Sequence, residues 1–208
     1  MELVVRHTAK VATGWQDGAV VDMDAHRCKE VATMFGCQAV TSLEHLPQLD
    51  AAVVAVPSAS HAEVGCALME RGIHCLVEKP LTLDESTADE VCDAQAHEGI
   101  AAATAYVYHF IPAIHEARAF VLRGTVGRIL HATAVSGQDF AALRPAFRST
   151  YYRTRETGGG AIQDSLTHVV NVIDWLLGPA KRVYCDAAQQ LLDGVTVEDT
   201  VNICARHG

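Results

Sequence analysis

Residues 51–80 read AAVVAVPSASHAEVGCALMERGIHCLVEKP. The segment opens with an uninterrupted apolar run at residues 51–56, which is typical of a parallel strand buried on both faces. Residues 60–63 (Ser-His-Ala-Glu) form a capping-box pattern that predicts a helix, and Gly72 is expected to end it. Residues 73–77 predict a second buried strand. Strand, helix and strand in this order indicate one βαβ unit.

The same alternation extends in both directions from this unit. Upstream, residues 18–22 predict a strand, and a helix from about Asp24 is expected to end at Gly36 in a left-handed cap. Downstream, residues 82–85 (Thr-Leu-Asp-Glu) form a second capping box, and residues 100–105 predict a further strand. Repeated βαβ units predict an α/β fold with a doubly wound parallel sheet and helices on both faces.

After residue 105 the regular alternation of predicted strands and helices ends, so we place a domain boundary there and predict domains at residues 1–105 and 106–208. The second domain is expected to be a partial α+β domain with a mostly antiparallel sheet. The glycines of residues 158–160 predict a close backbone approach where a helix starts. The expected elements are helices at 112–122 and from the triple glycine to Gly178, a polar loop at 138–157, and strands at 128–136, 182–189 and 195–205.

Composition and charge exclude several classes of function. With 208 residues, 50% of them hydrophobic, the chain can bury a core of one or two domains. The net charge of −9 argues against binding to nucleic acid or to an anionic membrane surface. No apolar run reaches the about 18 residues of a spanning helix, and the opening residues lack the pattern of a signal peptide. The seven cysteines are scattered without a C-x-x-C motif, so we expect reduced thiols in a cytoplasmic protein.

Glu78, Lys79 and Pro80 directly follow the strand predicted at residues 73–77. Ligands of open α/β sheets bind outside the carboxyl ends of the strands, so this position favours a functional role. A lysine there can bind a substrate hydroxyl and favour its deprotonated form. Pro80 fixes the turn and can adopt a cis bond. The alternative is a surface Glu-Lys pair before a proline loop.

Asp164 and His168 have the i, i+4 spacing that would place them on one face of the helix after the triple glycine. A histidine beside a carboxylate is suited to general acid–base catalysis. The alternative is an ion pair on the helix surface. A metal site would need further ligands, and the sequence offers no H-E-x-x-H motif, so no metal is expected.

Two other strand ends carry polar candidates. Asp22 ends the strand at residues 18–22, where dinucleotide-binding folds use an acid to accept hydrogen bonds from the adenosine ribose. An ordinary turn or cap residue remains the alternative for Asp22. Pro57, Ser58 and His61 follow the strand at residues 51–56, at the same expected edge of the sheet.

In this order, these motifs resemble the glucose-fructose oxidoreductase, inositol dehydrogenase and rhizopine-catabolism family, Gfo/Idh/MocA. The resemblance runs from about residue 6 to the end of the chain. Its most specific parts are Glu78-Lys79-Pro80 and the run Gly158-Gly-Gly-Ala-Ile-Gln-Asp164-x-x-x-His168. The resemblance implies a Rossmann domain, followed by an α/β domain, and hydride transfer between NAD (or NADP) and a hydroxyl-bearing carbon of a sugar, inositol or related polyol.

The resemblance also implies roles for individual residues. His168 would be the catalytic acid–base, Asp164 would bind and orient substrate hydroxyls, and Lys79 would bind the reacting oxygen. Asp22 would hold the adenosine ribose and favour NAD, because a carboxylate repels a 2′-phosphate. The resemblance implies a cofactor channel lined by Val56, Pro57, Ser58, Glu78 and Lys79 with His61 close by, and a substrate site formed by Lys79, Arg148, Tyr152, Asp164 and His168.

The chain departs from the family pattern in several places. Ser58 stands where Asn or Thr is frequent, and His109 stands where Arg is common. The family begins with a strand and a G-x-G-x-x-G turn that binds the pyrophosphate, whereas residues 1–6 contain no glycine and run into what resembles the later part of the first helix, residues 7–15. Residues 195–208 end before the further strands of the family's second sheet. We therefore expect a fragment of the family, truncated at both ends.

Two classes of function follow from this comparison. The first is an NAD(P)-dependent dehydrogenase with a small sugar or polyol substrate, no nucleic-acid or membrane partner, and a homo-oligomeric full-length parent. The alternative is a non-catalytic truncated relative that binds a ligand or a partner without turnover. The missing glycine-rich turn favours the alternative, while the presence of Lys79, Asp164 and His168 favours descent from a working enzyme. Neither the sugar nor the direction of the reaction follows from the sequence.

Overall fold

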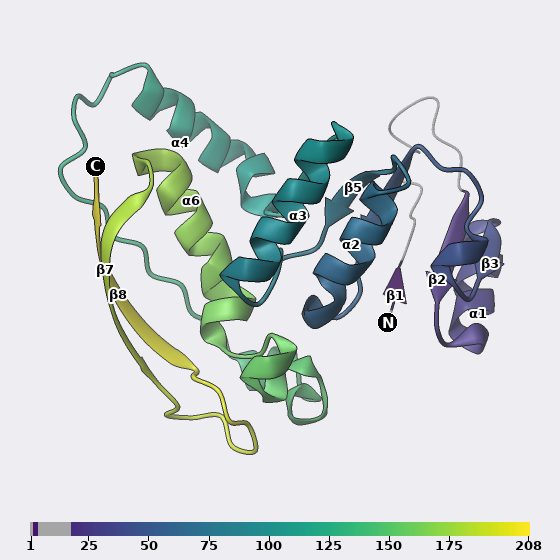
Figure 1. The fold of residues 1–208 in the computed structure, drawn as a ribbon. Helices are drawn as coiled ribbons and strands as arrows, with labels where there is room; N and C mark the ends of the chain where they lie inside the picture. Colours follow the sequence, from purple (N-terminus) through teal and green to yellow (C-terminus); the bar gives the residue numbers. More distant parts are fainter. Residues whose placement is uncertain (1, 4–17) are drawn as a thin grey trace. The chain divides into compact units, whose positions relative to one another are not determined.

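The computed structural model describes residues 18–208 and the backbone of residues 2–3. The chain divides into two compact units, Met1–Ala105 and Tyr106–Gly208, called the first and second unit below. In Figure 1 the first unit runs from purple to teal and the second from teal to yellow. The helical segment expected at residues 7–15 lies outside the described residues. No helix in the described part of the chain is long and apolar enough to cross a membrane.

The first unit contains the parallel βαβ arrangement that the sequence predicts. Strand β2 (Ala19–Asp22) pairs in parallel with β3 (Gln38–Val40), and Val20 lies opposite Ala39. In a second sheet, β5 (His74–Val77) pairs in parallel with both β4 (Ala51–Val54) and β6 (Ala102–Thr104). The predicted α/β class is therefore confirmed. Strand β3 was not predicted, because three residues are too short to show a periodic pattern.

Within the described residues, β2 and β4 belong to separate sheets. The two-residue strand β1 (Glu2–Leu3) pairs with β2 in the antiparallel direction, with Leu3 opposite Val21. Strand β4 keeps one edge without a ladder partner among these residues. The parallel sheet of the first unit is thus divided into two halves.

In the described part of the first unit, three helices each follow a strand. Helix α1 (Ala25–Phe35) starts at Asp24, whose carboxylate accepts hydrogen bonds from two main-chain N–H groups, and it ends at Gly36 with φ +70°. Helix α2 (His61–Met69) follows β4, and helix α3 (Glu85–Glu98) follows β5 and ends at Gly99 with φ +64°. The left-handed glycine at the end of α1 confirms the predicted helix end.

The two predicted capping boxes do not form. Ser60 makes no cap hydrogen bond, because residues 58–60 form a 3₁₀ turn that runs directly into α2. Helix α3 begins after Asp84 instead of Thr82, and the Asp84 carboxylate accepts a hydrogen bond from the main-chain N–H of Thr87. Either a carboxylate or a hydroxyl can cap a helix. Thr82 and Asp84 were therefore both candidates for the start of α3, and the sequence did not distinguish them.

One apolar cluster forms most of the interior of the first unit. It joins residues of β2, β4 and β5 to one face of α2, and Val54 and Leu68 have no exposed surface. Full burial of such side chains contributes about 1.5–3 kcal/mol each. The strands that precede the Pro57 and Lys79 loops, β4 and β5, are therefore held in place by this apolar packing. The buried members of the cluster are Ala19, Val21, Val40, Leu46, Ala52, Val54, Val56, Ala62, Val64, Leu68, Met69, Ile73, Cys75, Val77, Val91 and Ile100.

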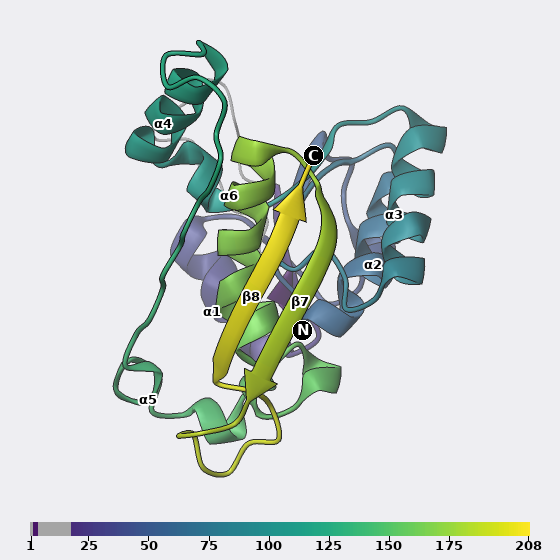
Figure 2. The same cartoon turned by 90° about the vertical axis from the view of Figure 1, so that its left-hand side faces the viewer.

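The second unit combines helices with one antiparallel ladder. Strands β7 (Ala180–Ala188) and β8 (Thr200–His207) pair with Tyr184 opposite Cys204, and Figure 2 shows them side by side in front of α6 (Thr167–Leu177). Helix α4 (Pro112–Leu122) precedes a long connection that contains α5 (Phe140–Leu143). The antiparallel sheet of the predicted α+β unit is confirmed, with strand ends shifted by a few residues.

The prediction of a strand at residues 128–136 is wrong. This segment has no regular structure, and Leu130 and Val135 are 80% and 93% exposed. Alternating apolar side chains form a strand only where a neighbouring strand supplies hydrogen bonds. Within the described residues of the second unit, the only ladder joins β7 to β8.

Asp199 closes the connection between β7 and β8. Its carboxylate accepts hydrogen bonds from the main-chain N–H groups of Gln190, Leu191 and Leu192 at 3.0, 2.8 and 2.7 Å. Partial burial acts to raise the pKa of Asp199, but these N–H groups outweigh it and lower the pKa to about 2. The ionised carboxylate therefore stabilises the folded connection.

This shift predicts a pH-dependent stability of the second unit. Because the pKa is lower in the folded state, the contribution is complete above the unfolded value of about 3.9 and is lost as the pH falls through about 2. We expect Asp199→Asn to lower the free energy of unfolding by about 2 kcal/mol at pH 6 and by much less at pH 2.5. Urea unfolding followed by Trp175 fluorescence measures this, with Asp186→Asn on exposed β7 as the control. An equal loss at both pH values would contradict the assignment.

Candidate active site

The loops after β4 and β5 carry the predicted cofactor residues of the first unit. The two strands are parallel neighbours, so Val56, Pro57 and Ser58 lie at the same edge of the sheet as Glu78 and Lys79. Val56 is buried, Ser58 and Lys79 are half-buried, and Pro57 and Glu78 are exposed. The Lys79–Pro80 peptide bond is cis. The structure therefore brings together the cofactor candidates that follow these two strands.

His61 connects the two loops. Its ring is 2% exposed, with Nδ1 2.7 Å from the carbonyl oxygen of Pro80 and Nε2 2.9 Å from the carbonyl oxygen of Val56. A carbonyl oxygen only accepts hydrogen bonds, so a neutral ring, which has one N–H, donates to one of the two oxygens, and a doubly protonated ring donates to both. Both nitrogens are occupied by the main chain. His61 therefore holds the loops together at the edge of the sheet where the cofactor channel is expected.

Loss of this bridge should loosen one loop more than the rest of the unit. We expect His61→Ala to destabilise the first unit by about 2–4 kcal/mol, from the lost ring volume and two carbonyl oxygens left without a partner. Peptide hydrogen exchange measures the local effect: amides of residues 78–84 should exchange faster than those of β5. His45→Ala, at an exposed histidine of the same unit, is the control. Uniformly faster exchange throughout the unit would contradict a bridging role.

Asp22 lies at the carboxyl end of β2 and is 1% exposed. One carboxylate oxygen, Oδ1, accepts a hydrogen bond from the main-chain N–H of Asp24 at 2.8 Å. Among the described residues, the other oxygen, Oδ2, accepts no hydrogen bond, and the Arg27 guanidinium lies 3.8 Å from it. A buried acceptor without a hydrogen bond is costly unless another group binds it. Asp22 therefore fits the ribose hydroxyls of a dinucleotide, which are hydrogen-bond donors.

In the second unit, the triple glycine starts the helix that carries the catalytic candidates. A Cβ atom on Gly159 would lie 2.3 Å from the carbonyl oxygen of Tyr152 and 2.7 Å from that of Thr154. Gly160 has φ +97°, and its Cβ would meet the Glu198 carboxylate. The prediction of a close backbone approach is confirmed.

Glu198 fixes the first turn of this helix. Its Oε1 accepts a hydrogen bond from the main-chain N–H of Ile162 at 2.9 Å, and its carbonyl oxygen accepts one from that of Ala161. Residues Ile162–Leu166 form a π-helical turn (η7), which continues into α6. The i, i+4 spacing of Asp164 and His168 assumed a regular α-helix, so the π-helical start is a difference from the prediction. Single π-helical turns occur frequently at functional sites.

Asp164 lies in this π-helical turn and is 6% exposed. The hydroxyl of Tyr151 donates a hydrogen bond of 2.7 Å to Oδ1 of Asp164. Partial burial and this hydrogen bond raise the pKa of Tyr151, so the phenol stays protonated and keeps donating. Tyr151 was not predicted, because its contact with Asp164 joins residues 13 apart across the triple glycine.

His168 is the second residue of α6 and contacts two tyrosine rings. It stacks on Tyr108 at 4.8 Å between ring centroids and meets the edge of Tyr106 at 5.9 Å. The Tyr106 hydroxyl lies 3.0 Å from Oγ1 of Thr167, within hydrogen-bonding distance. The 3₁₀ turn η3 (Val107–Phe110) is thereby held along α6. These rings restrict the orientation of the imidazole.

His109 also packs on α6. Its ring stacks on Trp175 at 4.1 Å with an interplanar angle of 13°. The guanidinium of Arg118 lies 4.5 Å from the centroid of the same indole ring and donates a hydrogen bond to the Trp175 carbonyl oxygen. The position that departs from the family pattern thus has a packing role in this chain.

The two predicted loop residues of the substrate site, Tyr152 and Arg148, both contact other residues of the second unit. Tyr152 is 3% exposed and packs in an aromatic core with Phe140 and Phe147, where burial raises its pKa to about 12. Arg148 covers the Phe147 ring at 4.4 Å, and its Nε donates a hydrogen bond to the Asp193 carbonyl oxygen. These contacts give both residues a structural role, and Tyr151 instead reaches Asp164.

The candidate residues therefore form two groups, each within its own unit. The first unit holds Asp22, the loop after β4, and Lys79. The second unit holds Asp164 and His168 with Tyr151. Among the described residues, no group of three or more histidine, cysteine or acidic side chains is arranged to hold a metal ion.

Comparison with known proteins covers nearly the whole chain. Residues 5–106 match the oxidoreductase family with an NAD-binding Rossmann fold, and residues 114–208 match the GFO/IDH/MocA C-terminal domain. Levoglucosan dehydrogenase of Pseudarthrobacter phenanthrenivorans is 28% identical over 168 residues, which are 79% of this chain and 43% of that protein. UDP-N-acetylglucosamine 3-dehydrogenase of Acidithiobacillus ferrooxidans is 34% identical over 113 residues, which are 54% of this chain and 36% of that protein.

A solved structure of levoglucosan dehydrogenase, in complex with NADH and levoglucosan, superposes with a TM-score of 0.79 and 25% identity. The match covers 92% of this chain and 54% of that one. The chain thus spans about half the length, or less, of the relatives it matches.

Proposed function

Because the chain belongs to the Gfo/Idh/MocA oxidoreductase family, we propose that it acts in hydride transfer between NAD and a hydroxyl-bearing carbon of a sugar, inositol or related polyol. The observation that carries the proposal is the buried Asp164, which accepts a hydrogen bond from Tyr151 and precedes the tyrosine-packed His168 on one helix. The names of the relatives support a sugar as the substrate class.

The proposed chemistry divides among three side chains. His168 takes the proton of the reacting hydroxyl, which suits a group whose usual pKa lies near neutrality. Asp164 accepts hydrogen bonds from substrate hydroxyls, and Tyr151 fixes the orientation of its carboxylate. The ammonium of Lys79 binds the reacting oxygen and stabilises negative charge that develops there. The nicotinamide, when bound, supplies the acceptor for the hydride.

The first unit would hold the cofactor. Oδ2 of Asp22 is the acceptor for a ribose hydroxyl, and its negative charge favours NAD over NADP. Val56, Pro57, Ser58, Glu78 and Lys79 line the edge of the sheet along which the dinucleotide would lie, and His61 sets the spacing of the two loops. The glycine-rich turn that usually binds the pyrophosphate does not occur in residues 1–208. We therefore expect weak binding of NADH by this chain.

Titration with NADH and NADPH tests the cofactor proposal. Trp15 and Trp175 report binding by fluorescence, and circular dichroism shows whether the protein is folded. We expect saturable binding with tighter affinity for NADH, and at least a tenfold loss in Asp22→Ala, because a hydrogen bond to a charged group contributes about 1.5–3 kcal/mol. The exposed Asp186→Ala is the control. A folded protein that binds neither nucleotide would contradict the proposal.

A second candidate is a non-catalytic relative that binds a ligand or partner without turnover. It is favoured by the separation of β2 and β4 into two sheets within the described residues, because the Rossmann fold binds its pyrophosphate at the strand that joins such halves. The two candidates differ in one result. Binding of a sugar without any binding of NADH would support the second.

A further inference from the structure

We propose that Arg144 and the aromatic pocket beside it form a subsite for an anionic substituent, carboxylate or phosphate, on the sugar substrate. This inference rests on the proposed function, because it takes Asp164 as the group that binds the sugar hydroxyls. All residues of the subsite belong to the second unit. A substrate that fills this subsite carries a negative charge, unlike a neutral sugar or polyol.

The distribution of charge along the chain points to this segment. The protein has a net charge of −9 and only 16 lysines and arginines. Four of these, Arg144, Arg148, Arg153 and Arg155, lie within residues 144–155. An acidic protein repels an anionic ligand at long range unless a local group of positive charges attracts it. Residues 144–155 supply such a group next to Asp164.

Arg144 differs in its contacts from three other arginines of the second unit, Arg118, Arg123 and Arg148. Arg148 and Arg118 donate hydrogen bonds to carbonyl oxygens, and Arg123 pairs with the Glu116 carboxylate at 2.8 Å. The Arg144 guanidinium lies 5.9 Å from the centroid of the Phe140 ring. Within residues 18–208 no carboxylate or carbonyl accepts a hydrogen bond from it, and the residue is exposed. Its five N–H donors are therefore available to a ligand.

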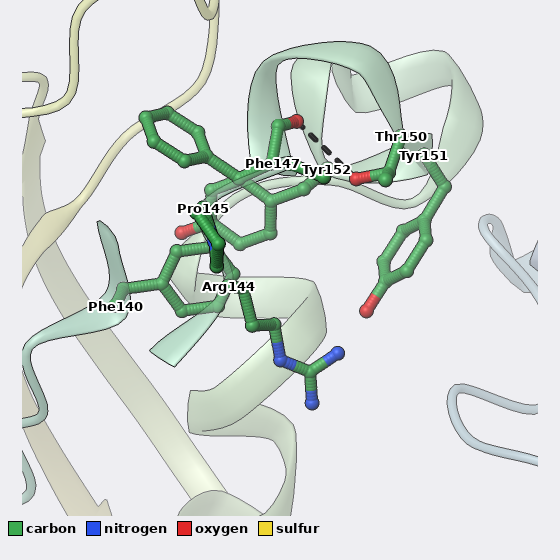
Figure 3. A pocket seen from close by; sticks show the side chains of 8 residues that line it. Phe140, Arg144, Pro145, Phe147, Thr150, Tyr151 and Tyr152 are labelled. Carbon is green, nitrogen blue, oxygen red and sulfur yellow. Dashed lines mark hydrogen bonds between the residues drawn. The ribbon is translucent and has the colours of Figure 1, made fainter. Parts of the chain in front are cut away.

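The pocket next to Arg144 has a volume of about 170 Å³. Figure 3 shows its aromatic wall, with the Arg144 guanidinium and the Tyr151 hydroxyl extending toward the same side. The pocket is smaller than the about 300–1,000 Å³ of most ligand sites, so it accepts one part of a ligand and excludes a whole nucleotide. Its lining residues are Phe140, Arg144, Pro145, Ala146, Phe147, Thr150, Tyr151 and Tyr152.

Tyr151 links this pocket to the proposed reaction site. It lines the pocket and donates its hydroxyl hydrogen to Asp164. The positive charge of Arg144 acts to lower the pKa of Tyr151, against the larger effects of burial and of Asp164, so the two side chains are electrostatic neighbours. A sugar whose hydroxyls reach Asp164 could thus place a charged substituent at Arg144. The planar guanidinium binds carboxylate and phosphate groups through two parallel hydrogen bonds.

Sugar binding to the 208-residue protein tests the proposal without the cofactor. Dissociation constants for D-glucuronate, D-glucose 6-phosphate and D-glucose are measured by calorimetry at low ionic strength. We expect at least one anionic sugar to bind ten or more times more tightly than glucose, and added salt to weaken that binding. Tighter binding of glucuronate would identify a carboxylate as the ligand group, and tighter binding of the phosphate ester would identify a phosphate.

Variants separate Arg144 from the general charge of the loop. Arg144→Gln should abolish the preference for the anionic sugar, and Arg144→Lys should retain part of it, because lysine keeps the charge but loses the paired donors. Arg153→Gln is the matched control: Arg153 is exposed on the same loop and does not line the pocket. Equal binding of all three sugars, or an equal loss in Arg144→Gln and Arg153→Gln, would overturn the subsite. If NADH fails to bind while the Arg144-dependent preference persists, the dehydrogenase proposal fails and the subsite stands.

Discussion

Replacing Gly159 by alanine is expected to destabilise the second unit by about 3 kcal/mol, at the upper end of the effects of overpacking. The added Cβ would lie 2.3 Å from the carbonyl oxygen of Tyr152 and 2.7 Å from that of Thr154. Neither atom can turn away as a side chain could, because both belong to the backbone. The main-chain N–H of Gly159 also donates a hydrogen bond to the Thr154 oxygen, which would be strained by any shift.

Thermal unfolding followed by Trp175 fluorescence measures the effect of Gly159→Ala, with an expected fall in Tm of roughly 10 °C. Gly137→Ala is the matched control, because a Cβ there meets nothing within 4 Å. That control should leave the Tm unchanged or raise it slightly, since alanine reduces the entropy of the unfolded chain. Equal Tm values for the two variants would show that the backbone near Tyr152 can move aside at little cost.

Replacing His168 by asparagine is expected to lower kcat for sugar oxidation by about 10²–10⁴-fold, the usual contribution of a general acid–base. Asparagine can form hydrogen bonds but cannot take up the hydroxyl proton near neutral pH. The Kd for NADH should stay unchanged, because the proposed cofactor residues all lie in the first unit. The pH profile of kcat should lose the limb that reports the catalytic base.

The control for His168→Asn is His131→Asn, at an exposed histidine of the same unit whose ring lies 3.0 Å from the Thr133 hydroxyl. This control should keep both the activity and the pH profile. An unchanged kcat in His168→Asn would assign the proton transfer to another group. A parallel loss of NADH binding would instead indicate that the substitution disturbs the fold.

Some of the site was predictable from the sequence because it depends on local order along the chain. Parallel strands place their carboxyl ends at one edge, so the grouping of Pro57, Ser58 and Lys79 followed from two apolar runs and their spacing. The close approach at the triple glycine was predictable too, since few other reasons explain three successive glycines before a helix. Local predictions failed where two nearby residues could both serve as the helix cap, as Thr82 and Asp84 could at the start of α3.

Other parts of the site depend on contacts between distant residues. The sequence placed His61 close to the expected cofactor channel, but only the structure shows both of its ring nitrogens against main-chain oxygens, one of them 19 residues away. Of two adjacent tyrosines, only packing decides that Tyr152 enters the aromatic core and that Tyr151 reaches Asp164. The segment at residues 128–136 has strand-like side chains but no ladder partner among the described residues.

Apolar periodicity and motif spacing are properties of neighbouring residues, so they were enough to predict the α/β class, the family resemblance and the candidates Lys79, Asp164 and His168. Which side chains orient these candidates is visible only in the folded chain. Tyr151 and Glu198 hold the turn of Asp164, two tyrosine rings contact His168, and His61 joins the loops of the first unit. Such contacts arise when the chain packs, and their energies depend on distances that no local pattern encodes.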